Sequence, residues 1–181
     1  MGTANSFVAY GPQWAHASSA VNKLYKGYVA EGGIHSPMII KMPSQQKGKA
    51  LNSSFTTVMD IAPTLLELAE VTYPASYNGL PLAPYQGESV LPLLKGEKDR
   101  VHDENYVMGW ELFDRCAVRK GDWKILKIES PFGKGRFELY NIANDPTESN
   151  DVAEKYPDKY QEMLAHWTSY VKDNGVIFSN E

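Results

Sequence analysis

A lysine followed by glycine lies five residues ahead of a Glu-Gly-Gly turn in the segment KGYVAEGGIHSP, residues 26–37. The ammonium group of Lys26 is a compact charge with three hydrogen-bond donors, which suits a small tetrahedral anion. Paired glycines at positions 32 and 33 allow positive φ angles and a close approach of the backbone to another group. We therefore expect Lys26 on a loop or helix end, at a site that binds an oxyanion.

The elements after this segment follow the order of a sheet covered by helices. The apolar run at 38–42 predicts a short strand that is buried on both faces of an α/β sheet. Residues 60–69 predict a helix, with Asp60 as its N-cap and with Ile61, Leu65 and Leu68 on one face. A strand followed by a helix is the repeating unit of α/β folds.

The last part of the chain has a different pattern, typical of an antiparallel sheet followed by a helix. From 157 to 173 apolar residues recur at helical spacing, with Pro157 at the first position and Gly175 after the last turn. We expect this helix to cover one face of a sheet. Four strand-like runs precede it, at 106–110, 115–119, 123–128 and 136–140.

The stretch between these two patterns, residues 73–100, is rich in prolines and glycines, which indicates a long connection. The sequence therefore predicts three parts. Residues 1–72 form an α/β part, residues 73–100 connect, and residues 101–181 form an α+β subdomain, with a four-stranded antiparallel sheet covered by a C-terminal helix.

The motif around Lys26 resembles the Lys-Gly-x-x-x-Glu-Gly-Gly-x-x-x-Pro signature late in the catalytic domain of sulfatases, in the alkaline phosphatase superfamily. The similarity runs from about residue 7 to about residue 175 and is closest to bacterial arylsulfatases. Four further stretches match in the same order: 10–15 (YGPQWA), 57–69 (TVMDIAPTLLELA), 117–124 (AVRKGDWK) and 138–148 (ELYNIANDPTE).

The resemblance implies a sulfuric ester hydrolase in which Lys26 contacts the sulfate group and stabilises charge as the S–O ester bond breaks. Three further residues are candidate substrate-binding residues. His35 stands where the family usually has arginine, so a fixed positive charge becomes a titrating one. Trp14 and His16 are predicted either to line a pocket mouth or to be ordinary packed and solvated residues.

The family's other catalytic parts are not found in these 181 residues. The resemblance implies a formylglycine nucleophile made from a Cys/Ser-x-Pro-x-Arg motif, and a Ca²⁺ site with an Asp-Asn-Gly ligand motif. Cys116 lies in FDRCAVR, which does not match, and we interpret it as a small strand residue. The chain therefore looks like the C-terminal third of a sulfatase. We expect neither cofactor in this chain, and we expect the isolated chain to be inactive.

Three alternatives stay open. The parent enzyme is an arylsulfatase, or it is a phosphodiesterase or phosphonate hydrolase of the same superfamily, or the chain is a non-catalytic folding or interaction module. The cluster His102-Asp103-Glu104 suggests a metal or acid–base site, but strand residues alternate between faces, so solvated charge is the simpler interpretation.

Composition and charge limit the classes of partner that this chain is expected to bind. The net charge of −4 argues against a nucleic-acid partner, and no apolar run reaches the roughly 20 residues of a membrane span. A single cysteine excludes an internal disulfide framework and leaves the compartment open, bacterial cytoplasm or periplasm. Residues 1–5 show no signal-peptide pattern. The expected partners are a sulfate ester and the missing N-terminal catalytic part, and exposed sheet edges could drive oligomer formation.

Overall fold

A computed structural model describes residues 11–42 and 51–179. The chain divides into two compact units. One is formed by the segments up to residue 40 and from residue 106 onward, and the other by residues 41–105. Among the described residues, no helix has both the length and the hydrophobicity to cross a membrane.

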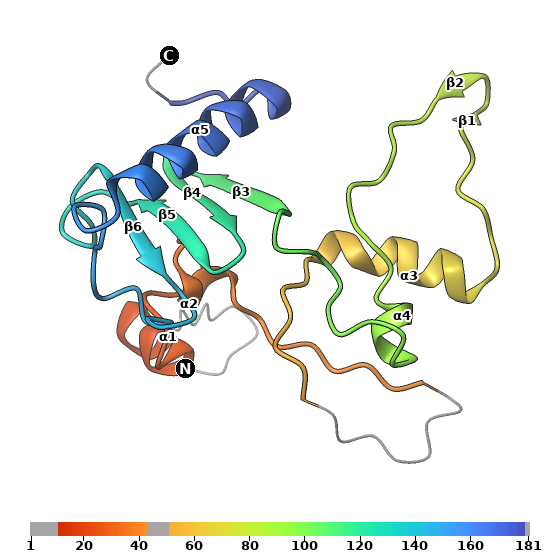
Figure 1. Cartoon of the computed structure of the whole chain (residues 1–181), viewed down its shortest axis with the longest axis horizontal. Coiled ribbons are helices and arrows are strands. Elements are labelled where there is room, and N and C mark those ends of the chain that lie inside the picture. Colours follow the sequence, from red (N-terminus) through yellow and green to blue (C-terminus); the bar gives the residue numbers. More distant parts are fainter. Residues whose placement is uncertain (1–10, 43–50, 180–181) are drawn as a thin grey trace, which may run out of the picture. The chain divides into compact units, whose positions relative to one another are not determined.

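A four-stranded antiparallel sheet forms the centre of the first unit. Its strands follow in chain order, β3 (Val107–Leu112), β4 (Arg115–Lys120), β5 (Trp123–Lys127) and β6 (Phe137–Asn141). The turn between β4 and β5 contains Gly121 at φ 55°, a conformation that glycine adopts without strain. The four predicted strands are therefore confirmed (Figure 1).

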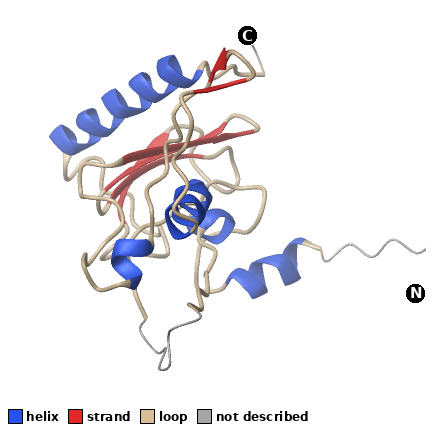
Figure 2. Cartoon of the chain, turned by 90° about the vertical axis from the view of Figure 1, so that its right-hand side faces the viewer, coloured by secondary structure: helices blue, strands red, loops and turns tan. Residues whose placement is uncertain are grey.

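Helix α5 (Pro157–Asn174) lies along one face of this sheet (Figures 1 and 2). It begins with Pro157, and Gly175 follows it in the left-handed conformation at φ 60°. Met163 and Trp167 are its buried residues, and they pack against Cys116 and Val118 of β4. Burial raises the pKa of the Cys116 thiol to about 11, as expected for a core cysteine that is not reactive. The predicted helix and the face it covers are confirmed.

The opposite face of the sheet is covered by the segment that contains the lysine motif. Helix α1 (Pro12–Ser19) precedes this segment, and helix α2 (Glu31–Ile34) lies within the motif. Strand alternation explains the second core, because side chains next to those under α5 point the other way. The buried members of this core are Leu24, Tyr28, Val29, Ala30, Ala117, Leu126, Ile128 and Tyr140.

The second unit holds short elements. These are η1 (Val58–Asp60), α3 (Ile61–Leu68), the two-stranded pair β1 (Ser76–Tyr77) and β2 (Leu80–Pro81), and α4 (Leu91–Leu94). Asp60 occupies the N-cap position of α3, as predicted, but its side chain makes no capping hydrogen bond to that helix and instead forms a capping box with Thr57 at the start of η1.

One expectation about burial is wrong. The apolar run at 38–42 forms no strand and is exposed, with Ile39 96% accessible. The stripe on α3 is also exposed, with Leu65 60% accessible. A strand needs a neighbour for its backbone hydrogen bonds, and none of the described residues pairs with this run. The sheets that the described residues form are antiparallel, so the α/β part and the division at 72 and 100 stay predictions.

Candidate functional site

Lys26 lies on the turn that crosses the sheet face opposite α5, between the buried residues Leu24 and Tyr28. Its side chain is exposed and makes no hydrogen bond or ion pair within the described parts of the chain. Gly27, next to it, has φ 102°, which only glycine adopts readily. The turn therefore presents an ammonium group that has no partner among the described residues, on a backbone shaped by the following glycine.

The paired glycines of the motif allow a close backbone contact. Gly32 and Gly33 lie in α2 without positive φ angles, contrary to the first expectation for them. A Cβ on Gly32 would lie 2.1 Å from the Leu24 carbonyl oxygen, and one on Gly33 would lie 2.0 Å from the Tyr28 carbonyl oxygen. The Gly32 amide also donates to the Lys23 carbonyl at 2.9 Å. Helix α2 therefore packs directly on the turn that carries Lys26.

Glu31 pairs with Lys124 of β5 instead of Lys26. The Lys124 Nζ lies 2.8 Å from Glu31 Oε1 and 2.7 Å from Glu148 Oε1. The Glu31 backbone amide donates to Glu148 Oε2 at 2.8 Å. The three residues are buried, with 0%, 7% and 1% of Lys124, Glu31 and Glu148 exposed. Burial raises the pKa of Glu148, while the nearby ammonium of Lys124 opposes that shift.

Two further cations hold the same turn to the sheet. Arg115 donates from Nη1 to the Gly27 carbonyl at 2.6 Å, and its guanidinium lies 4.2 Å from the centre of the Tyr28 ring. Hydrogen bonds to Glu129 raise the pKa of Arg115, so this cation is fixed. Lys23 donates to the Glu148 carbonyl at 3.2 Å. Residues on both sides of Lys26 are therefore anchored.

The other sequence-predicted site residues are exposed on the same unit. His35 follows α2, with its Nδ1 3.7 Å from Glu31 Oε2. Trp14 is 68% exposed on α1, and the His16 ring lies 6.5 Å from that of Tyr25. Within the described ranges, these side chains make no hydrogen bond or ion pair with Lys26. Their roles in binding stay predictions.

Sequence reading missed Lys124 and Glu148. One pattern could have indicated that Lys124 is buried. In the strand run WKIL, Lys124 lies on the same face as Leu126, so it occupies an inward position. A buried lysine requires a partner. Nothing in the sequence identified that partner, since Glu31 and Glu148 are 93 and 24 positions away.

His102 in the second unit is not solvated, which corrects the expectation for the His102-Asp103-Glu104 cluster. Its Nε2 lies 3.0 Å from both carboxylate oxygens of Asp60. Asp60 also accepts from the backbone amides of Thr57 and Glu88. The side chains of His102 and Asp60 are 1% and 0% exposed, so this buried pair holds segments of the unit together.

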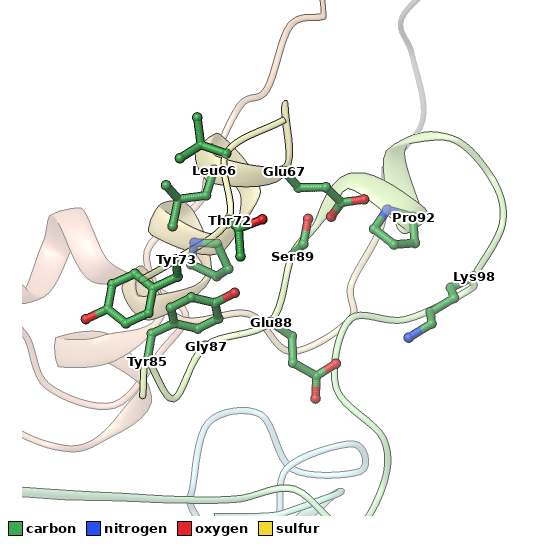
Figure 3. Close-up of a pocket in the computed structure, with 12 residues that line it drawn as sticks. Leu66, Glu67, Thr72, Tyr73, Tyr85, Gly87, Glu88, Ser89, Pro92 and Lys98 are labelled. Atoms are coloured by element: carbon green, nitrogen blue, oxygen red, sulfur yellow. The ribbon is translucent and has the colours of Figure 1, made fainter. Parts of the chain in front are cut away.

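The second unit also contains an open pocket of about 500 Å³ (Figure 3). The rings of Tyr73 and Tyr85 meet edge to face there, 5.1 Å apart. Glu67, Glu88 and Lys98 add charges of both signs to its lining. None of the four predicted site residues lines this pocket. Within the described ranges, no group of three or more His, Cys, Asp and Glu side chains is placed to hold a metal ion.

Comparison with known proteins identifies the family. The family described as N-sulphoglucosamine sulphohydrolase, C-terminal, matches residues 23–174, which include the whole Lys26 turn, the sheet and α5. The chain belongs to the sulfatases. An uncharacterised sulfatase of Schizosaccharomyces pombe is 38% identical over 178 residues, which is 98% of this chain and 32% of that protein.

Two arylsulfatases are more distant relatives of this sulfatase chain. The arylsulfatase of Klebsiella aerogenes is 36% identical over 91 residues, covering 50% of this chain and 20% of that protein. Arylsulfatase K of Gallus gallus is 27% identical over 150 residues, covering 78% and 26%. The chain therefore spans a third or less of the length of these relatives.

A solved structure shares the fold. The crystal structure of Ps i-CgsB in complex with k-i-k-neocarrahexaose superposes with a TM-score of 0.68 at 22% identity, covering 86% of this sulfatase chain and 33% of that chain. At this identity the likeness shows that the two chains share a fold.

Proposed function

We propose that this chain is the C-terminal part of an arylsulfatase-type sulfuric ester hydrolase, and that Lys26 holds a sulfate oxygen of the substrate. The observation that carries the proposal is the family match over residues 23–174, because this range contains Lys26 within KGYVAEGG. The arylsulfatases among the relatives support an aryl sulfate or a similar monoester as substrate.

The geometry of the turn suits this role. The ammonium of Lys26 is exposed and has no described partner that would compete with an anion. Two unit charges 4 Å apart interact by about 4 kcal/mol at an effective dielectric of 20. A donor that is already in place when charge moves onto the sulfate oxygens lowers the barrier to S–O cleavage.

The proposal places the nucleophile and the metal outside this chain. The residues that would hold a formylglycine hydrate as nucleophile and a Ca²⁺ ion as counter-charge to the sulfate would belong to the catalytic part that this chain does not include. The isolated chain would then bind the substrate weakly and would not turn it over. Lys26, with His35, Trp14 and His16 as candidate neighbours, would form one wall of the completed pocket.

The test begins with the coding sequence upstream of this chain, which should encode Cys/Ser-x-Pro-x-Arg and Asp-Asn-Gly. The longer enzyme is then produced in a host that forms formylglycine and assayed on an aryl sulfate and on an aryl phosphodiester. We expect Lys26→Ala to lower kcat/KM for the sulfate about 10²–10³-fold. The control, Lys172→Ala on the exposed side of α5, should leave it unchanged.

Three results would overturn the proposal. These are aryl sulfate turnover by the 181 residues alone, an unchanged rate in Lys26→Ala, and a preference of the longer enzyme for the phosphodiester. The last result would favour a phosphodiesterase or phosphonate hydrolase of the same superfamily.

A further inference from the structure

Lys124, Glu31 and Glu148 form a buried charge cluster that joins three segments far apart in the sequence. Glu31 opens α2, Lys124 lies in β5, and Glu148 follows β6. The Lys124 ammonium bridges the two carboxylates at 2.8 and 2.7 Å. Glu148 also accepts the Glu31 amide, so it holds both the side-chain partner and the backbone of the motif.

Such a cluster is a poor way to gain stability. Transferring three charged groups from water to a protein interior costs several kcal/mol per ion, and apolar residues of similar size often serve as well. The better-attested use of buried charge is to fix one arrangement of segments against alternatives. Here the arrangement fixed is the position of the motif on the sheet, because Glu31 of the motif is joined to Lys124 of β5 and to Glu148 after β6.

Lys26 has no anchor of its own among the described residues, so its neighbours determine its position. Lys23 binds the Glu148 carbonyl, Gly27 accepts from Arg115, and Glu31 is held by the cluster. Two of these three anchors involve Glu148. The backbone on both sides of Lys26 is therefore fixed by residues from the C-terminal segments of the same unit.

We propose that Lys124 and Glu148 are positioning residues that hold the Lys26 turn in one place for oxyanion binding. They act through Glu31 and do not touch the substrate. The role of Lys26 in oxyanion binding rests on the proposed function. The claim that Lys124 and Glu148 keep the turn ordered does not depend on it. It assigns to the C-terminal sheet the task of presenting the lysine to the catalytic part of the enzyme.

The first test measures hydrogen exchange in the 181-residue chain. Lys124→Met should increase the exchange rates of the motif amides, those of Glu31, Gly32 and Gly33. This increase should be at least about tenfold larger than the increase at the central sheet amides of Val118 and Ile125. Lys124→Arg should restore part of the protection, since it keeps the charge. The control, Lys120→Met, removes a lysine that pairs with Glu162 and should leave the motif amides unchanged.

A uniform increase over motif and sheet, or none at the motif, would overturn the proposal. If Lys124→Met does not fold, Glu31→Gln takes its place, because it keeps the size of the side chain and removes only its charge. Unchanged exchange at Gly32 and Gly33 in that variant would then overturn the proposal.

The second test uses the longer enzyme. If Lys124 acts through Lys26, the double variant Lys26→Ala with Lys124→Met should lose no more kcat/KM than Lys26→Ala alone. Multiplying losses would show a general structural role and contradict positioning. If Lys26→Ala alone has no effect, the proposed function fails, and the exchange experiment still decides whether Lys124 orders the turn.

Discussion

The carboxylate of Asp151 accepts hydrogen bonds from several segments of the first unit. Its Oδ1 accepts the backbone amides of Leu139 and Ala153, and its Oδ2 accepts from Lys134 and Arg136. Partial burial opposes ionisation, but these donors outweigh it and lower the pKa of Asp151 to about 2. A folded-state pKa below the ordinary 3.8 adds stability above that pH, and the added stability is lost as pH falls from about 4 to about 2.

We therefore predict that Asp151→Asn destabilises the chain by about 1–3 kcal/mol at pH 7, because it removes a charged acceptor from a nearly buried position. Thermal unfolding followed from pH 6 to pH 2 should show a smaller loss of stability in the variant than in the wild type. Asp173→Asn, at an exposed position of α5, is the control and should follow the wild type. Parallel pH curves for wild type and Asp151→Asn would contradict the prediction.

Single residues were predictable when their neighbours in sequence carried the information. Cys116 is a buried strand residue, as its apolar run indicated. His102 was misjudged, because its partner Asp60 lies 42 positions away and only the fold brings them together. Lys26 was found through the resemblance to sulfatases, since an exposed lysine on a turn has no distinctive physical signal of its own.

At the scale of elements, Gly109 in β3 determines how closely α5 approaches the sheet. A Cβ at this position would lie 2.5 Å from ring atoms of Tyr170. We predict that Gly109→Ala destabilises the chain by about 1–3 kcal/mol through overpacking. In a Tyr170→Ala background the same change should cost much less, as measured by the midpoint of denaturant unfolding. Equal costs in both backgrounds would show that the ring does not set this distance.

The elements that were predicted correctly have a recognisable pattern within their own residues. Strand-like runs predicted the four strands, and the helical stripe with Pro157 and Gly175 predicted α5. The run at 38–42 and the stripe of α3 have equally clear patterns, yet both are exposed. An apolar pattern indicates that a surface needs covering, but does not say whether the same chain supplies the cover.

At the scale of the whole molecule, the exposed stripe of α3 should make the isolated chain self-associate. Ile61, Leu65 and Leu68 form a contiguous exposed apolar face on one helix. We predict concentration-dependent association in sedimentation velocity, reduced by Ile61→Lys with Leu65→Glu. Ile177→Glu is the control, since Ile177 is also exposed but lies beyond α5. A wild-type chain that stays monomeric would contradict this and would favour a self-sufficient non-catalytic module.

The cluster around Lys124 also has a consequence for biosynthesis. The ribosome makes Glu31 93 residues before Lys124, which is roughly 5–20 seconds at ordinary rates of translation. The nascent lysine turn has no buried partner until β5 has emerged, and it lacks Glu148 until the segment after β6 has emerged as well. A premature stop codon anywhere before position 148 would therefore leave the turn without Glu148, even if every residue of the motif had been translated correctly.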